Sequence, residues 1–253
     1  MFSSSRRLAL VLVLSCSATL GAQAQSSSSQ PADAPAQAAP APAPTQGSLT
    51  VQARIRERRE KRRATAVHDV YSHLYEIYVG AGYLRFQPGP GAVAGKALQK
   101  LNEYEWNVGV SRYYSERFGV TIDGRGTYGS AYVGNPPVTS GAVNKPAISQ
   151  YSGMIGPNYR FLLEPKYSVS GRVLAGFSRG IFSGDTKPFG PTALGLYPDG
   201  TSVMLSASVP VEYNVSPNLG VRIAPEYVMT NFGSSIQNSL GFTGGVVVRW
   251  GKQ

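Results

Sequence analysis

From about residue 70 onward, hydrophobic and polar positions alternate with a period of two. In the stretch "FGVTIDGRGTYG", Phe118, Val120 and Ile122 share one face, and Asp123 and Arg125 lie on the other. Successive side chains of a β-strand point to opposite sides of the sheet, so the pattern predicts strands with one apolar and one polar face. Eight such runs are present, at 74–86, 103–114, 118–132, 148–162, 167–182, 201–216, 219–234 and 239–250.

The connections between these runs alternate in length. Three are tight turns, at 115–117, 163–166 and 216–218, whereas 87–102, 133–147 and 183–200 are long and rich in Gly, Pro and Ser, and 233–238 is a shorter fourth loop. The runs also exceed the usual five or six residues of a strand and suit the roughly 9–11 residues of a tilted membrane strand. Short turns at one end and long loops at the other are typical of outer-membrane barrels, with the turns in the periplasm.

The apolar face carries aromatic residues near the strand ends and aliphatic residues between them. Tyr75 and Tyr83 are eight residues apart, which corresponds to about 20 Å along the membrane normal for a tilted strand and fits an apolar band of about 25 Å between aromatic girdles. The predicted membrane-interface aromatics are Tyr75, Tyr83, Tyr104, Trp106, Tyr167, Tyr213 and Trp250.

The polar face carries equal numbers of acidic and arginine residues. Enclosed charges are costly unless they are paired, and arginine is the preferred bidentate partner of a carboxylate, so we expect these groups to neutralise one another inside a barrel. The predicted interior charge network consists of Glu76, Glu105, Asp123, Arg125, Arg160, Arg172, Glu212, Arg222, Glu226 and Arg249.

Periodicity alone does not say which face points outward, so a soluble, lipocalin-like barrel with the aromatic face inside is the alternative. Charged residues number only 26 among positions 66–253, about 14% against about 25% in soluble domains. A water-facing surface built from the glycine- and serine-rich face would carry little charge. Loop asymmetry also has no reason to exist in a soluble barrel, so the sequence favours the transmembrane form.

The region 71–250 resembles the small eight-stranded outer-membrane barrels of the OmpA/OmpX type. The likeness rests on the strand number, the loop asymmetry and the last strand, where Phe242, Val246, Val248 and Trp250 match the alternating, aromatic-terminated pattern that the barrel assembly machinery recognises in that family. Three further residues follow Trp250, whereas the family usually stops at the aromatic residue. The resemblance implies a filled barrel in the outer membrane of a Gram-negative cell, in contact with outer-membrane lipid.

The N-terminal part is predicted to direct secretion. Arg6 and Arg7 precede the apolar run "LALVLVL", and Ala22-Gln23-Ala24 forms an A-x-A cleavage site, so residues 1–24 read as a signal peptide. Cys16, the one cysteine, lies in a sequence that loosely resembles a lipoprotein cleavage box, so lipidation stays an open alternative. Residues 25–51 contain Ser, Gln, Pro and Ala with almost nothing to bury and are predicted to be a disordered linker.

A basic helical segment is expected at 52–69, before the barrel at 70–253. Helix-forming residues dominate it, and it could be simply a solvated charged helix. Alternatively, it could bind anionic lipid headgroups or cell wall from the periplasmic side. The predicted basic patch comprises Arg54, Arg56, Arg58, Arg59, Lys61, Arg62 and Arg63.

The sequence offers little for catalysis or cofactor binding. His68 and His73, the two histidines, precede or begin the first strand, so a histidine-dependent hydrolase at the long-loop end would lack its base. Gly124–Gly129 satisfies G-x-G-x-x-G but lies within a strand and is not followed by a helix, which excludes the dinucleotide motif. We therefore expect no enzyme activity, no catalytic or metal-binding residues, no cofactor and no nucleic-acid partner.

The favoured hypothesis is a non-enzymatic outer-membrane barrel that stabilises the envelope or displays its extracellular loops. A second hypothesis is an adhesin or ligand-binding barrel that acts through the loops 133–147 and 183–200, whose Tyr, Phe and Pro content suits contacts. A third is a small-solute pore, although an eight-stranded barrel leaves room for side chains rather than for a channel.

Overall fold

The computed structural model describes residues 51–93, 96–133 and 145–252, without the side chains of 92–97. These residues belong to one compact unit, Leu49–Gln253. The predicted signal peptide, Cys16 and the linker apart from Val51 lie outside the described residues.

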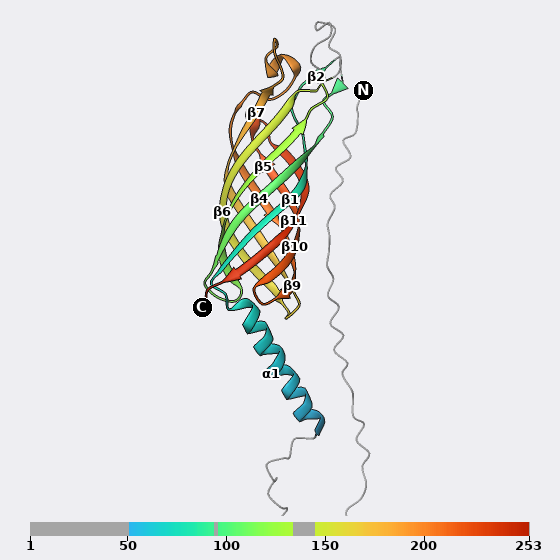
Figure 1. The fold of residues 1–253 in the computed structure, drawn as a ribbon. Coiled ribbons are helices and arrows are strands. Elements are labelled where there is room, and N and C mark those ends of the chain that lie inside the picture. Colours follow the sequence, from blue (N-terminus) through green and yellow to red (C-terminus); the bar gives the residue numbers. More distant parts are fainter. Residues whose placement is uncertain (1–50, 94–95, 134–144, 253) are drawn as a thin grey trace, which may run out of the picture. The chain divides into compact units, whose positions relative to one another are not determined.

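The strands form one antiparallel sheet that closes on itself. β1 pairs with β4 on one side and with the last strand, β11, on the other, where Tyr75 lies opposite Trp250; Figure 1 shows β1 and β11 side by side. β8 and β9 occupy one position in the ring, which therefore has eight positions and confirms the predicted eight-stranded antiparallel barrel. The elements are α1 (Val51–Tyr71), β1 (Tyr75–Phe86), β2 (Ala92–Val93), β3 (Lys96–Ala97), β4 (Leu101–Tyr113), β5 (Phe118–Ser130), β6 (Ala147–Leu163), β7 (Tyr167–Gly184), η1 (Pro191–Leu194), β8 (Gly200–Ser208), β9 (Val211–Ser216), β10 (Leu219–Thr230), η2 (Phe232–Ser234) and β11 (Gln237–Trp250).

One predicted strand, 201–216, is divided into β8 and β9. Both halves pair with β10 in the same register, since Ser208 lies opposite Glu226 and Val211 lies opposite Ile223. The break falls at Val209 and Pro210, where proline has no backbone N–H to donate to the ladder. The interruption is therefore local, and the barrel wall continues through it.

The barrel has its polar face inside and its apolar face outside. β4 shows this most clearly, because its buried and exposed residues alternate without interruption from Leu101 to Tyr113. Exposed positions include Tyr104, Trp106 and Val108, whereas Glu105 is buried. A closed barrel satisfies all strand hydrogen bonds internally, which a membrane requires, and an apolar exterior suits lipid. The soluble, lipocalin-like alternative is wrong, and the chain forms a transmembrane β-barrel.

Short and long connections lie at opposite ends of the barrel. Three short turns join β4 to β5, β6 to β7 and β9 to β10, and the longer segments 87–100, 131–146, 185–199 and 231–236 join the other ends. α1 contacts the short-turn end through its last turns, where His68 meets Glu116 and Arg63 meets Glu164. Among the described residues, no helix has both the length and the hydropathy to span a membrane.

Candidate functional site

The barrel lumen gathers the charged side chains that the sequence assigns to its polar face. All ten are at least nine-tenths buried, and they come from β1, β4, β5, β6, β7, β9, β10 and β11: Glu76, Glu105, Asp123, Arg125, Arg160, Arg172, Glu212, Arg222, Glu226 and Arg249. They separate into two layers along the barrel, and the lumen also holds polar and aromatic groups that the sequence interpretation missed.

The layer nearer the short turns is organised around Glu76. Its Oε2 accepts hydrogen bonds from Arg160 at 2.6 Å and from Arg249 at 3.0 Å. Arg249 also donates to Glu212 at 2.6 Å and to the side-chain oxygen of Asn214 at 2.9 Å. These bonds join strands on different sides of the ring, so the layer ties the walls of the barrel together.

Tyr71, the last residue of α1, closes the short-turn end of this layer. Its side chain is fully buried, its hydroxyl donates to the backbone oxygen of Glu164 at 2.9 Å, and it accepts from Asn214 at 2.7 Å. The Arg160 guanidinium lies 5.0 Å from its ring centroid, a cation–π distance. Burial raises the pKa of the Tyr71 hydroxyl, so the group stays a neutral hydrogen-bond donor. The helix is therefore fixed to the barrel by a buried residue as well as by the surface contacts of Arg63 and His68.

The middle layer places three carboxylates around one guanidinium. Arg125 lies 2.8 Å from Asp123, 2.8 Å from Glu226 and 3.2 Å from Glu105. Arg172 lies 4.0 Å from the other oxygen of Asp123. Because β4, β5 and β10 all contribute to this cluster, it crosses the lumen.

Tyr78 adds an aromatic side chain to the middle layer and has no counterpart in the sequence-based site. Its hydroxyl donates to Asp123 and accepts from Arg172. The guanidinium of Arg222 lies over its ring, 3.5 Å from the centroid. Tyr78 has the same parity on β1 as Glu76, so strand alternation was the signal that could have placed it inside.

Glu103 is a sixth lumenal acid, so the acids and arginines are not equal in number. It is fully buried, and Gln150 donates to each of its carboxylate oxygens at 3.0 Å. No basic nitrogen lies within 4.0 Å of it in the part of the chain that the structure describes. The alternation that places Glu105 inward also places Glu103 inward, two residues earlier on β4.

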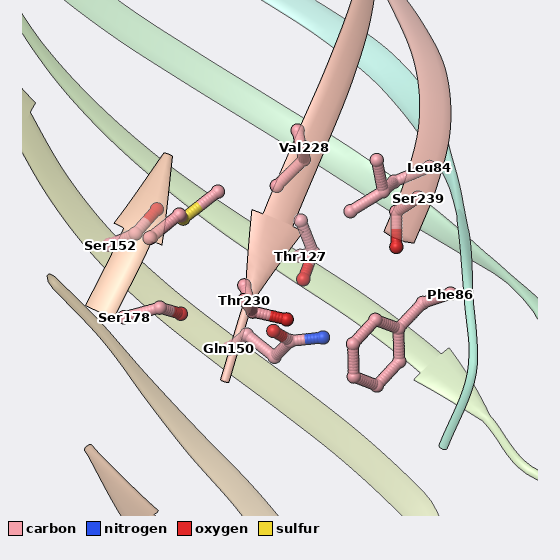
Figure 2. Close-up of a pocket in the computed structure, with 10 residues that line it drawn as sticks. Leu84, Phe86, Thr127, Gln150, Ser152, Ser178, Val228, Thr230 and Ser239 are labelled. Carbon is pink, nitrogen blue, oxygen red and sulfur yellow. The ribbon is translucent and has the colours of Figure 1, made fainter. Parts of the chain in front are cut away.

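Toward the long loops the lumen contains apolar side chains as well as polar ones. Leu84, Met154, Leu174, Met204 and Val228 form a buried hydrophobic cluster. A cavity of about 10 Å³ lies beside it, which is near the minimum for one water molecule, and is lined by hydroxyl and amide groups together with the ring of Phe86 (Figure 2). The labelled polar residues in this view are Thr127, Gln150, Ser152, Ser178, Thr230 and Ser239.

A second hydrophobic cluster caps the long-loop end. Phe86, Phe182 and Phe232 pack edge-to-face or stacked within it. The loop between β7 and β8 contributes Leu194, Leu196 and Tyr197, all buried, and Phe189 packs against them. Aromatic residues of 183–200 were expected to be available for contacts, but Phe189 and Tyr197 face the cap instead. Residues 134–144 of the other predicted contact loop lie outside the described residues.

The outer surface carries the predicted membrane-interface aromatics. Tyr104, Trp106, Tyr167, Tyr213 and Trp250 are exposed, and Tyr75 and Tyr83 are half-buried. Tyr75 stacks on Trp250 with ring centroids 5.9 Å apart at one end of the β1–β11 pair, and Tyr83 lies 6.0 Å from Phe242 at the other. Aromatic pairs at both ends of these strands, with aliphatic residues between them, agree with the exterior of an outer-membrane barrel.

Both histidines lie at the short-turn end, apart from the lumen. His68 Nδ1 is 2.7 Å from Glu116, and His73 Nδ1 is 2.9 Å from the backbone oxygen of Val70. The described residues contain no group of three or more His, Cys, Asp or Glu side chains arranged to hold a metal ion. The predicted basic patch lies on α1, where its seven basic side chains are exposed.

Comparison with known proteins gives matches among solved structures only. Ail, the attachment invasion locus protein of Yersinia pestis, solved in complex with the heparin analogue sucrose octasulfate, is 18% identical, with 68% of this chain and 97% of that chain covered and a TM-score of 0.42. Neisserial surface protein A is 14% identical, with 70% and 97% covered and a TM-score of 0.48. The outer membrane protein OprG from Pseudomonas aeruginosa is 9% identical, with 70% and 97% covered and a TM-score of 0.45.

No family model and no curated protein sequence matches the chain. The barrel assignment rests on the strand pairing and the burial pattern described above.

Proposed function

We propose that this protein is a non-enzymatic outer-membrane anchor that holds the basic helix α1 at the periplasmic face, where the helix binds a negatively charged envelope surface. The observation that carries the proposal is the attachment of α1 to the barrel. Tyr71 is buried among lumenal side chains, and Arg63 and His68 pair with acids of two different short turns. A charged helix that was simply exposed to solvent would need none of these contacts.

The charge of α1 suits an anionic partner. The helix contains seven basic and three acidic residues, and its basic side chains are exposed. Each Lys or Arg near an anionic surface contributes about 1 kcal/mol to binding at moderate salt. Anionic headgroups and anionic cell-wall polymer present the same chemistry, so the experiment must separate them.

The filled lumen supports an anchoring role over passage of small solutes. Charge pairs cross it in two layers, and apolar side chains close it toward the long loops. The loop between β7 and β8 places in the cap the aromatic residues that an adhesin would display, so this loop does not support the adhesin hypothesis.

The test is co-sedimentation at low salt with purified cell-wall sacculi, and separately with phosphatidylglycerol and phosphatidylcholine vesicles. The test variant changes Arg54, Arg56, Arg58, Arg59 and Arg62 to Gln. It keeps Arg63, which pairs with Glu164, and Lys61, which pairs with Glu57. The control variant changes Arg85, Lys100 and Lys187, exposed at the long-loop end, to Gln.

We expect wild type and the control to bind one of the anionic partners and to be released by salt, and the test variant to lose most of that binding. Sacculi and vesicles then identify the partner. Undiminished binding of the test variant to both partners would refute the proposal.

A further inference from the structure

The lipid-facing surface of the barrel is not even. A furrow runs along the outside of β7, β8 and β10. Two hollows form it, one of about 380 Å³ and one of about 180 Å³. The floor of the larger hollow is made of small side chains, since Gly171, Ala207 and Pro225 line it. Its walls are formed by outward side chains such as Val173 and Leu240, which are 58% and 67% exposed.

The two hollows follow one another along the same pair of strands. Ala207 on β8 lies opposite Tyr227 on β10 and belongs to the larger hollow. Leu205 and Met229, the next opposed pair on the same face, belong to the smaller one. The furrow therefore extends along the strands toward the long-loop end, where Asn231 and Ile236 line its last part.

Arg179 lies beside the long-loop end of this furrow. It is exposed on β7 and lies opposite Thr201 on β8, two residues from Val203, which lines the smaller hollow. No carboxylate oxygen lies within 4.0 Å of its guanidinium among the residues that the structure describes. Its other neighbour across the sheet is Tyr151, an exposed aromatic residue whose hydroxyl accepts a 3.2 Å hydrogen bond from Tyr128.

We propose that the furrow and Arg179 form a binding site for one phosphate-bearing lipid of the outer leaflet. The acyl chain lies along the small-residue floor, and the phosphate meets the guanidinium of Arg179. Charge complementarity argues for this occupant. Arg179 has no carboxylate partner among the described residues and lies next to exposed aromatic residues of the long-loop end, which places it at headgroup depth. A phosphate is the anion available at that depth. Arginine binds phosphate through paired N–H donors. A second copy of the chain would supply an apolar surface for the furrow but no anion for Arg179.

The experiment is native mass spectrometry of the detergent-solubilised barrel with three probes. These are phosphatidic acid, diacylglycerol with the same acyl chains, and inorganic phosphate. Arg179→Gln removes the cation, and Ala207→Phe fills the floor. Lys100→Gln removes an exposed cation of the long-loop end away from the furrow, and Ala81→Leu enlarges an exposed alanine of β1. Gel migration before and after boiling confirms that each variant is folded.

We expect wild type to retain one phosphatidic acid at detergent levels that remove diacylglycerol, and inorganic phosphate not to be retained. Arg179→Gln should lower the retained fraction about fivefold, the effect of one arginine at a membrane surface, and Ala207→Phe should lower it as well. The Lys100→Gln and Ala81→Leu controls should match wild type. Equal retention of phosphatidic acid and diacylglycerol by wild type would overturn the proposal. So would retention of phosphatidic acid by the Arg179→Gln and Ala207→Phe variants that equals that of wild type. Binding of inorganic phosphate alone would reduce it to an anion contact without a lipid.

Discussion

The guanidinium of Arg222 lies against the ring of Tyr78, with its carbon 3.5 Å from the ring centroid. No carboxylate oxygen lies within 4.0 Å of Arg222 in the described part of the chain, so the ring is its nearest electrostatic partner. The same tyrosine bonds to Asp123 and Arg172 through its hydroxyl. One residue thus stabilises buried charges by two separate kinds of contact.

Two substitutions of Tyr78 should separate those contacts. Tyr78→Phe keeps the ring but removes the hydroxyl, and we expect a loss of about 1.5–3 kcal/mol in the free energy of unfolding, typical of a hydrogen bond to a charged group. Tyr78→Leu also removes the ring and should cost about 2 kcal/mol more, the value of a desolvated cation–π contact. Urea unfolding in lipid vesicles measures both. Equal stabilities of the two variants would show that the ring contributes nothing.

The position of Tyr78 also predicts a contrast between two glycines. A Cβ added at Gly109 would lie 2.2 Å from the Tyr78 ring, whereas a Cβ at Gly153 would have nothing within 4 Å. Gly109→Ala should therefore displace the tyrosine and destabilise the barrel by about 1–3 kcal/mol. Gly153→Ala should stay within about 0.5 kcal/mol of wild type. The comparison uses the same unfolding assay, and a neutral Gly109→Ala would mean that Tyr78 can move without cost.

Strand alternation predicted the strands of the barrel and the short and long connections between them. Which face meets lipid followed from the low charge content and the loop asymmetry, because alternation alone leaves that choice open. Alternation was sufficient to place Glu103 and Tyr78 inside, because they share parity with Glu105 and Glu76, but a charge-balanced set of ten residues left them out. Pairing within the lumen could not be predicted, since Arg160 meets Glu76 across 84 residues of sequence. The hydrophobic cap combines strand residues such as Phe86 and Phe182 with loop residues such as Leu194, and the loop residues follow no period that would show the direction of their side chains.

The two lumenal glutamates Glu76 and Glu103 should respond in opposite ways to neutralisation. Glu76 binds Arg160 and Arg249, so Glu76→Gln leaves two buried cations with a weaker partner and should cost about 3–5 kcal/mol. Glu103 has no basic nitrogen within 4.0 Å among the described residues, and its carboxylate accepts hydrogen bonds from Gln150. Glu103→Gln removes a buried charge while keeping an acceptor for Gln150, so we expect unchanged or increased stability.

Unfolding by urea, with gel migration before and after boiling as a check of folding, distinguishes these cases. Glu105→Gln serves as an intermediate case, because its one arginine is shared with Asp123 and Glu226. A loss for Glu103→Gln as large as that for Glu76→Gln would show that Glu103 is held as a carboxylate by a compensating group.

The layered lumen predicts that the barrel does not conduct ions. Single-channel recording in planar bilayers should show no discrete steps for wild type. Replacing residues 187–197 by a Gly-Ser linker removes Leu194, Leu196 and Tyr197 from the cap. This variant should show no conductance steps either, because Arg125 still binds carboxylates from β4, β5 and β10 across the lumen. In addition, side chains fill the interior of an eight-stranded barrel. Steps that appear only in the linker variant would show that the cap is the sole barrier and that the charge layers leave a path open.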